Sequence, residues 1–363
     1  MTTLRLGTRG SQLALIQANM VAAVLRARAG VSCDVIAIRT SGDRLADAPL
    51  AQIGGKRVFV KEIEDALLDG AVDLAVHSSK DLPAELPDGL ALGATLPRED
   101  PRDAIVLPVP SNVEDPVTRA AERPGPSGIE RPFPNGVDFP AAIAPASSVE
   151  AFAQLSLEDI LQRIGEAPII GTSSVRRIAQ LVQLFPDARF SAIRGNLDTR
   201  LRKLDTGEFN AVVLAAAGLR RLGRHARISA VLPPEVCLPA PGQGIIAVET
   251  RRDDAEVRAF VERINDPASA AALAAERMVV LRLGGGCQMP IGAYATVSST
   301  EVSLSAMVIS LDGARVVRAE ATGPLAEPEA AGTRAAMRLL AQGAAEILAE
   351  VEGARGAVEG LQP

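Results

Sequence analysis

The stretch IIGTSSVRRIAQLVQLF, residues 169–185, decides the fold class of this chain. Ile169–Thr172 is a short apolar run typical of a buried strand, and Ser174–Phe185 has apolar residues at helical spacing. A strand that leads directly into a helix is the repeating unit of α/β sheets. A further strand is predicted at Phe190–Ile193. We therefore expect a parallel-type α/β sheet.

The same alternation extends in both directions along the chain. Strands are predicted at Leu4–Thr8, Asp34–Ile38, Leu74–Ser78, Leu90–Leu96, Ala104–Leu107, Ala211–Ala215 and Ile245–Thr250. Helices are predicted at Ser11–Ala29, Val58–Leu68, Asn196–Asp205, Ala217–Leu222 and Asp254–Ile264. No internal repeat is visible in the sequence.

Two segments depart from this alternation. Pro108–Pro145 contains nine prolines, several-fold more than a background of about 5%, and predicts a surface insertion. Ser156–Gly165 predicts a helix with Ser156 as its N-cap. The side chains expected to point inward from it are Leu157, Ile160, Leu161 and Ile164.

The C-terminal part changes character. After a helix at Ala268–Leu283 come three strands and a long helix, predicted at Ile291–Val297, Glu301–Ile309, Arg315–Ala321 and Pro328–Glu352. Clustered strands flanked by helices indicate a small α+β domain with a three-stranded antiparallel sheet. The expected division is α/β domain 1 (4–107 and 245–264), the insertion and capped helix (108–167), α/β domain 2 (168–244) and domain 3 (267–363).

Composition narrows the class of protein. The 363 residues suggest two or three domains, and 47% hydrophobic with 23% charged residues is typical of a soluble globular protein. No run of about 18 apolar residues exists, so a membrane span is excluded. The N-terminus lacks a secretory signal pattern, and three cysteines cannot form a disulfide framework, which favours the cytoplasm.

Other function classes find no support. Two histidines argue against a histidine-rich zinc site or a Ser–His triad, and no metal is expected. A net charge of −6, one Tyr and no Trp argue against nucleic-acid binding. Gly54-Gly55-Lys56 lacks the other residues of a P-loop, and the GxGxxA match at 242–247 leads into a strand, which argues against dinucleotide binding.

Cationic and hydroxyl-bearing residues follow five predicted strands, at the edge where α/β sheets bind ligands. They are Arg9 and Ser11; Ser78, Lys80 and Asp81; Thr172, Ser173, Ser174, Arg176 and Arg177; Arg194 and Arg200; and Arg220 and Arg221. Arginine suits bidentate contacts to carboxylates or phosphates. The pattern predicts a cleft for a polyanionic ligand.

Single residues in this pattern leave alternatives open. Asp81 is either a turn or N-cap residue, or a carboxylate inside a cationic cleft that stabilises a cationic intermediate. Cys33 and Cys237 are expected to be buried small hydrophobes. Cys287 follows three glycines and is either an ordinary turn cysteine or a nucleophile or attachment thiol.

At these residues the sequence resembles the porphobilinogen deaminase (hydroxymethylbilane synthase) family. The matching stretches, in order, lie at 8–15, 54–62, 75–81, 98–104, 171–177, 194–201, 238–244 and 285–292. The resemblance covers nearly the whole chain except Pro108 to about Ala167. The insertion is longer than the family's usual connection, and Ile16 stands where a Trp is common.

The resemblance implies two periplasmic-binding-protein-like (type II) α/β domains and a transferase that condenses four porphobilinogen molecules head to tail with loss of ammonia. A dipyrromethane cofactor would be attached to Cys287 by a thioether. The implied catalytic residues are Asp81, Lys80 and Arg9. The implied cofactor-binding residues are Cys287, Lys56, Ser78, Asp81, Thr172, Ser173, Ser174, Arg176, Arg177 and Arg194. The implied substrate-binding residues are Arg9, Ser11, Arg194, Arg200, Arg221 and Gln243.

The chemistry explains these residue types. Each pyrrole carries two carboxylates, which fixed guanidinium groups neutralise, and a carboxylate near the pyrrole N–H stabilises the positive charge that develops on deamination. Two other functions remain open: a two-lobed binding protein for an anionic solute, and an inactive paralogue. The expected partner is porphobilinogen, with no nucleic acid or membrane, and the expected form is a cytoplasmic monomer.

Overall fold

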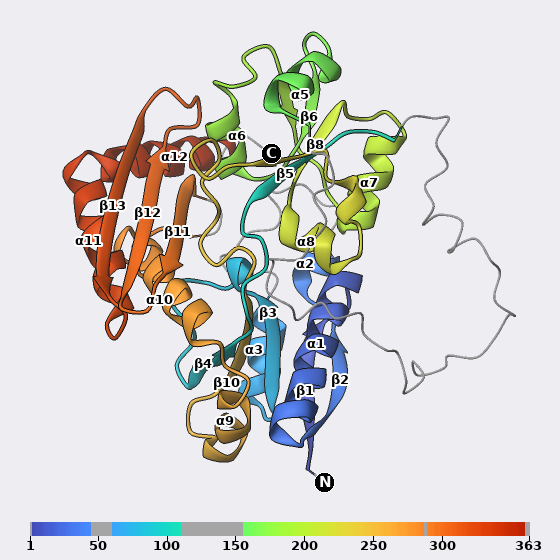
Figure 1. Cartoon of the computed structure of the whole chain (residues 1–363), viewed down its shortest axis with the longest axis vertical. Coiled ribbons are helices and arrows are strands. Elements are labelled where there is room, and N and C mark those ends of the chain that lie inside the picture. Colours follow the sequence, from blue (N-terminus) through green and yellow to red (C-terminus); the bar gives the residue numbers. More distant parts are fainter. Residues whose placement is uncertain (1, 45–59, 110–154, 287–288, 360–363) are drawn as a thin grey trace, which may run out of the picture.

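The computed structural model of the chain describes residues 2–44, 60–109, 155–286 and 289–359. These residues form two five-stranded sheets and one three-stranded sheet, each accompanied by helices. In Figure 1 the first sheet is at the bottom, the second at the top and the three-stranded sheet at the left. None of the described helices has the length and apolar character needed to cross a membrane.

The first sheet combines the start of the chain with a strand that returns much later. Its strands are β1 (Thr3–Arg9), β2 (Ser32–Ile38), β3 (Leu74–Ser78), β4 (Leu90–Thr95) and β10 (Ile246–Arg251), in the order β2-β1-β3-β10-β4. Its helices are α1 (Gln12–Ala29), α2 (Ser41–Arg44), α3 (Lys61–Leu68) and α9 (Ala255–Glu262), and a 3-10 turn, η2 (Ser79–Asp81), follows β3. The apolar face of α1, with Ala18, Val21 and Leu25, packs into the core of this sheet.

The second sheet has the same arrangement. Its strands are β5 (Asp103–Val106), β6 (Ile169–Gly171), β7 (Arg189–Ser191), β8 (Ala211–Ala215) and β9 (Ala230–Leu232), in the order β7-β6-β8-β5-β9. Its helices are α5 (Leu157–Ile164), α6 (Val175–Leu181), α7 (Leu197–Asp205) and α8 (Ala216–Arg221), with a 3-10 turn η4 (His225–Arg227). Two α/β units of this type confirm the predicted fold class.

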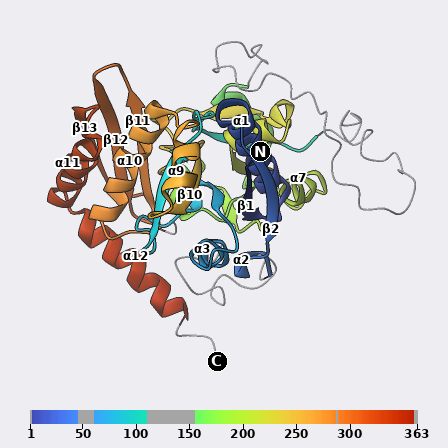
Figure 2. The same cartoon turned by 90° about the horizontal axis from the view of Figure 1, so that it is seen from below.

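The third sheet is an antiparallel meander. Its elements are β11 (Ile291–Val297), β12 (Glu301–Ile309), β13 (Val316–Pro324), α10 (Pro267–Arg282), α11 (Pro328–Ala341) and α12 (Ala344–Glu359). Its core is rich in alanine, so the helices approach closely. A Cβ added at Gly332 on α11 would collide with the carbonyl of Ala275 on α10. Figure 2 shows α12 extending from this unit toward the C-terminus.

Strand direction differs from the expected parallel pattern at two places. β10 is antiparallel to both β3 and β4, and β5 is antiparallel to both β8 and β9. β5 follows β4 along the chain but joins the second sheet, and β10 follows β9 but joins the first. Each of these strands enters its sheet from the other unit, which is why it runs against its neighbours.

These crossings also correct the expected boundaries. Residues 103–107 were assigned to domain 1, but Asp103–Val106 pairs in the second sheet. The capped helix was set apart from the α/β units, but Ile160 and Ile164 of α5 lie in the core of the second unit. Ser156 caps that helix as predicted, whereas Leu161 is 41% exposed and does not point inward.

Two further expectations were wrong in detail. The predicted long C-terminal helix is divided into α11 and α12 at Gly343, which has a φ of +94°. The strand β9 was not predicted at all.

The two described cysteines differ in burial. Cys237 is buried as expected, but Cys33 is only partly buried. The predicted insertion lies mostly outside the described residues.

Candidate active site

The two α/β units meet close to the start of α6. β6 ends at Gly171, and α6 begins at Val175 with Ser174 as its N-cap. Arg176 and Arg177 lie in the first turn of α6 and are only 4% and 6% exposed. Two neighbouring buried guanidinium groups need an acid nearby, because each has lost its hydration.

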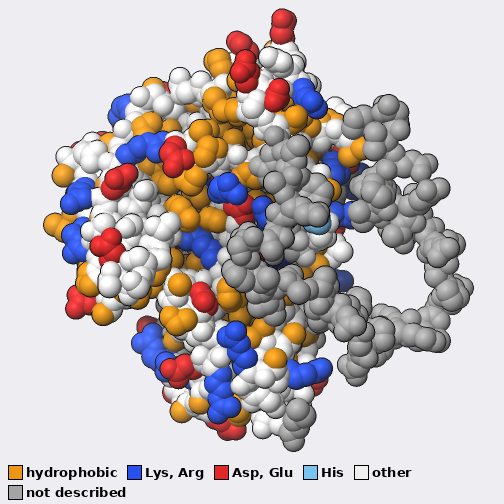
Figure 3. Space-filling view, in the orientation of Figure 1, with side chains coloured by type: hydrophobic (Ala, Val, Ile, Leu, Met, Phe, Trp, Pro, Cys, Tyr) orange, Lys and Arg blue, Asp and Glu red, His pale blue; other side chains and the backbone are white. Residues whose placement is uncertain are grey.

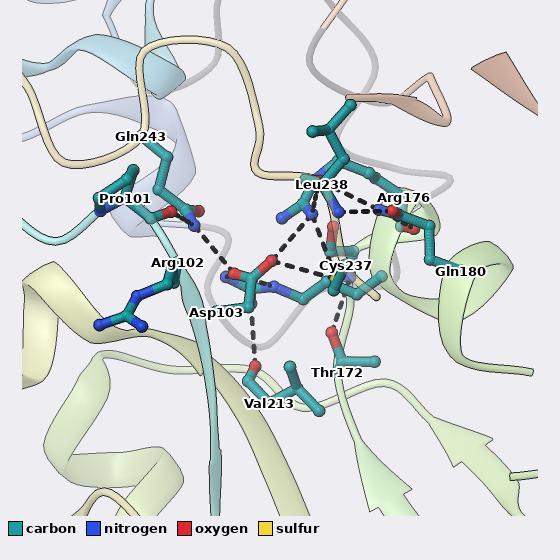
Figure 4. Close-up of polar contacts among 12 residues, drawn as sticks. Pro101, Arg102, Asp103, Thr172, Arg176, Gln180, Val213, Cys237, Leu238 and Gln243 are labelled. Atoms are coloured by element: carbon teal, nitrogen blue, oxygen red, sulfur yellow. Dashed lines mark hydrogen bonds and ion pairs between the residues drawn. The ribbon is translucent and has the colours of Figure 1, made fainter. Parts of the chain in front are cut away.

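Asp103, the first residue of β5, is that acid and is fully buried. Arg177 donates from Nε (3.0 Å) and Nη2 (2.7 Å) to Asp103 Oδ1. Arg176 Nη1 lies 2.8 Å from Asp103 Oδ2 (Figure 4). Burial alone would raise the pKa of Asp103, but the charges of Arg176 and Arg177 hold this pKa well below its usual value. The carboxylate is therefore ionised at neutral pH.

Gln243 connects Asp103 to Lys80. Its Nε2 donates to Asp103 Oδ1 (2.9 Å) and to the carbonyl oxygen of Pro101 (2.6 Å), as Figure 4 shows. These two acceptors fix the direction of the amide, so that its Oε1 accepts from Lys80 Nζ at 3.4 Å. The polar atoms of Gln243 are thus engaged within the protein, and its side chain is buried.

Lys80 and Asp81 lie in η2, directly after β3. Burial and then the charge of Arg177 lower the pKa of Lys80 to about 8, against the opposing charge of Asp81. Burial and Arg177 also lower the pKa of Arg200 to about 10, and Asp81 again acts in the opposite direction. Asp81 itself is exposed. Lys80 therefore lies within Coulombic range of Asp81 and Arg177, and Arg200 lies within Coulombic range of the same two residues, so the site draws on both α/β units.

The predicted hydroxyl groups between β6 and α6 serve local structure. Ser173 Oγ donates to the carbonyl oxygen of Ile193 (2.7 Å), and Thr172 Oγ1 accepts from the N–H of Ser174 (3.2 Å). These bonds hold the turn from which Arg176 and Arg177 project.

The predicted residues of the first unit lie at the ends of β1 and β3. Ser11 caps α1 by accepting from the N–H of Ala14, and Ser78 hydrogen-bonds to Gln17 of α1 (2.9 and 3.1 Å). Arg9, the last residue of β1, is partly buried. These residues therefore lie on the same edge of the sheet as Lys80 and Asp81.

The remaining arginines come from the second unit. Arg194 follows β7 and is partly buried. Arg221 at the end of α8 donates from Nη2 to the carbonyl oxygen of Gly244 (2.6 Å), and burial lowers its pKa to about 10. Figure 3 shows several Lys and Arg side chains near the middle of this face, beside acidic side chains, and others spread over the rest of the face.

Two predicted site residues lie outside the described residues. They are Lys56 and Cys287. Their roles stay predictions. Gly284–Gly286, which precede Cys287, directly follow α10 and Leu283 in the third unit.

Sequence reasoning missed Asp103 as a site residue. The signal was present, because an acid at the start of an apolar strand requires a buried partner. Cys237 was expected only to fill space. Burial raises the pKa of its thiol to about 12, and the neutral S–H donates to Asp103 Oδ2 at 3.3 Å.

Several buried donors at this junction have no acceptor among the residues that the structure describes. They are Arg176 Nε, Arg221 Nε and Ser79 Oγ. Buried donors are normally hydrogen-bonded, so this set favours a ligand rich in acceptors.

A separate apolar cavity of about 400 Å³ lies between β4 and α10, and none of these site residues lines it.

The fold and the site define a class: a two-lobed α/β protein with a third domain, whose cationic strand ends suit an anionic ligand. Residues 4–123 and 129–259 match the family model described as the dipyromethane cofactor binding domain of porphobilinogen deaminase, and residues 270–341 match that of its C-terminal domain. The chain belongs to the porphobilinogen deaminase family of enzymes.

The curated relatives agree with this assignment. Porphobilinogen deaminase of Moorella thermoacetica is 42% identical over 361 residues, which cover 99% of this chain and 100% of the relative. The enzymes of Geotalea daltonii and Geobacter metallireducens are 41% and 42% identical, over 96% of this chain and 94% of each relative. Among solved structures, the methionine-binding protein MetQ is 11% identical with a TM-score of 0.39, over 72% of this chain and 89% of that chain, a likeness too weak to support any statement about function.

The family match also corrects one expectation. The resemblance was expected to stop between Pro108 and about Ala167, but the family model matches much of that stretch, namely 108–123 and 129–167.

Proposed function

We propose that this enzyme has hydroxymethylbilane synthase activity: it joins four porphobilinogen molecules head to tail, with loss of ammonia at each step, and releases the linear tetrapyrrole by hydrolysis. One observation supports this most directly. Lys80 and Arg200, which come from different α/β units, both lie within Coulombic range of the exposed carboxylate of Asp81. Such a site neutralises a ligand with many carboxylates and still keeps one acid for a developing cation.

The donors of the site fit the dipyrromethane cofactor of the family, which we propose is held by Cys287 through a thioether. The carboxylate arms of a dipyrromethane are hydrogen-bond acceptors at neutral pH, and Arg176 Nε, Arg221 Nε and Ser79 Oγ are buried donors that need acceptors. When bound, the cofactor supplies the pyrrole from which the chain grows. The other proposed cofactor ligands are Lys56, Ser78, Asp81, Thr172, Ser173, Ser174, Arg176, Arg177 and Arg194.

Each residue has a role that follows from its charge. Asp81 accepts hydrogen bonds from pyrrole N–H groups. It also stabilises the positive charge that develops when the carbon–nitrogen bond of the aminomethyl group breaks. Lys80 and Arg9 act beside it as cations. The proposed substrate ligands are Arg9, Ser11, Arg194, Arg200 and Arg221. Gln243 is buried, and its polar atoms are already hydrogen-bonded within the protein. We therefore propose that Gln243 positions Lys80 and does not contact the substrate.

The domain division is part of this proposal. Two α/β domains, exchanging β5 and β10, hold the cationic site between them, and a third domain from residue 267 onward carries the cofactor thiol. We expect the enzyme to act in the cytoplasm as a monomer on a small-molecule substrate, without nucleic acid or membrane.

The test is the intact-protein mass of the purified chain. The wild type should carry extra mass equal to two pyrrole units, Cys287→Ala should lack it, and the control Cys33→Ala should keep it. Asp81→Ala should keep the fold but lose turnover of porphobilinogen by about 10²–10⁴-fold, whereas Asp88→Ala, an exposed acid after the same strand, should not. Reversible binding of porphobilinogen with no added mass would indicate an anionic-solute-binding protein, and cofactor without turnover an inactive paralogue.

A further inference from the structure

We propose that Asp103 is a positioning residue of this site: its buried carboxylate orients Arg176 and Arg177 and, through Gln243, Lys80 toward the anionic ligand. The inference rests on the proposed function and adds to it a residue that touches neither substrate nor cofactor. Asp103 is fully buried, so any effect it has on the reaction must pass through its neighbours.

The carboxylate of Asp103 is saturated by donors from three separate segments. Oδ1 accepts from Arg177 Nε (3.0 Å), Arg177 Nη2 (2.7 Å) and Gln243 Nε2 (2.9 Å). Oδ2 faces Arg176 Nη1 (2.8 Å) and accepts from Cys237 Sγ (3.3 Å). With its acceptor sites filled in this way, Asp103 is suited to hold other side chains in place and not to bind a ligand itself.

The two arginines are fixed in direction by these bonds and by one backbone contact each. Arg177 Nη1 donates to the carbonyl oxygen of Val213 (2.9 Å), and Arg176 Nη1 donates to that of Leu238 (2.7 Å). Arg176 Nε is left without an acceptor among the described residues. A guanidinium group held at one end presents its remaining N–H groups in a set direction, which favours directional bonds to a carboxylate.

The charge balance of the cluster also depends on Asp103. Two guanidinium groups and one carboxylate leave a net charge of about +1 at the junction, so the cluster still attracts an anion. Without the carboxylate, the two buried cations would repel each other and move apart. Asp103 therefore allows two arginines to occupy adjacent buried positions in the first turn of α6.

The link to Lys80 runs through one amide. Because Gln243 Nε2 is committed to Asp103 and to the carbonyl oxygen of Pro101, Gln243 Oε1 must face Lys80 Nζ. Charged groups on three elements also act on the pKa of Lys80: Asp81 in η2, Asp103 on β5, and Arg176 and Arg177 on α6. Of these, Asp103 and Asp81 raise the pKa of Lys80, and the two arginines lower it.

The experiment compares Asp103→Asn with Asp205→Asn, which removes an exposed carboxylate of the same unit that pairs with Arg227 and does not contact Asp103. The chain has only four lysines (Lys56, Lys61, Lys80 and Lys203), so the titration of Lys80 can be followed by NMR of lysine labelled at the ε-carbon. Asp103→Asn should lower the pKa of Lys80 below about 8, because a negative charge that raises it has been removed.

In the same samples, Asp103→Asn should raise KM for porphobilinogen on the order of 10–100-fold. The alkaline limb of its pH–rate profile should move to lower pH together with Lys80. Asp205→Asn should leave KM and the pKa of Lys80 unchanged. A folded Asp103→Asn variant with the wild-type Lys80 pKa and the wild-type KM overturns the proposal.

A second variant covers the case in which Asp103→Asn does not fold. Asp103→Glu keeps the charge but displaces it by one methylene, so it should keep the Lys80 pKa near 8 and still raise KM. If Asp103→Glu has the wild-type KM, or if neither variant folds, Asp103 is structural and the proposal is rejected. The Lys80 titration needs no turnover, so failure of the proposed activity in the wild type is distinguished from failure of this inference.

Discussion

Lys80 carries its positive charge in surroundings that disfavour it. Burial and Arg177 lower its pKa to about 8 from the ordinary value of 10.5. Between these two pH values the folded state binds fewer protons than the unfolded state, so this group makes stability rise with pH in that window. Below about pH 8 both states are protonated, and the partly buried charge destabilises the fold.

Replacement of Lys80 should therefore separate stability from activity. Lys80→Met should raise the free energy of unfolding at pH 7 by on the order of 1–3 kcal/mol, and the gain should shrink as the pH approaches 10.5, while turnover is lost. Urea denaturation at pH 7 and pH 9.5 measures this, with Lys61→Met, an exposed lysine, as the control that shows little pH dependence. A Lys80→Met protein that is no more stable than the wild type at pH 7 contradicts this account.

At this scale the sequence predicted which residues gather but not how they pair. The residue types at the strand ends indicated a cationic site, and Lys80 and Arg200 do each lie within Coulombic range of Asp81 and Arg177. The partner of Arg177 could not be read from the sequence, because Asp103 lies 74 residues away and pairing at that separation depends on the crossing of the chain.

At the scale of elements, apolar periodicity located most helices and strands but gave no strand direction. β5 and β10 were both expected, yet both are antiparallel to their neighbours. A strand buried on both faces has the same apolar pattern in parallel and antiparallel sheets. Its direction is set by the unit from which the chain enters.

The C-terminal helices show a second limit of periodicity. Apolar spacing continues from α11 into α12, but Gly343 between them has a φ of +94°, which side-chain-bearing residues rarely adopt. Gly353 lies inside α12, exposed, with open space where a Cβ would be added. Gly343 is therefore needed for the break between the two helices, whereas nothing in the structure requires a glycine at position 353.

Alanine substitution should give opposite signs at these two positions. Gly343→Ala should lower the free energy of unfolding by about 1–2 kcal/mol through backbone strain. Gly353→Ala should raise it by about 0.5–1 kcal/mol, because alanine has less freedom to lose on helix formation. Thermal unfolding of both variants measures the difference, and equal shifts for the two would show that no helix break exists at Gly343.

At the scale of the whole molecule, the two α/β units share one strand order although the sequence shows no repeat. Each unit takes one strand, β5 or β10, from the other half of the chain, so neither sheet is complete on its own. Topology of this kind depends on which elements pack together and not on residue identity, which is why the sequence pattern did not reveal it. Because of this exchange, the connection from β4 to β5 and the connection from β9 to β10 lie side by side, and both contact Glu276.

Glu276 of α10 ties both crossing segments to the third unit. Its Oε1 accepts from Arg98 Nη1 (2.6 Å) and from the N–H of Ala295 (2.7 Å). Its Oε2 accepts from Arg98 Nη2 (3.2 Å) and from the N–H of Gly242 (2.6 Å). Arg98 precedes β5 on the outgoing crossing, Gly242 precedes β10 on the return, and Ala295 lies on β11. One fully buried carboxylate therefore couples all three sheets.

Removal of this charge should uncouple the third unit from the other two. Glu276→Gln places an amide donor against N–H donors and leaves Arg98 without a carboxylate, which should cost about 3–5 kcal/mol. Calorimetry should show a lower melting temperature and a separate transition for the third unit. The exposed pair Arg315–Glu350 in that same unit is the control, and Glu350→Gln should melt like the wild type, since exposed ion pairs contribute little. If Glu276→Gln melts in one transition at the wild-type temperature, the coupling of the three sheets does not depend on this carboxylate.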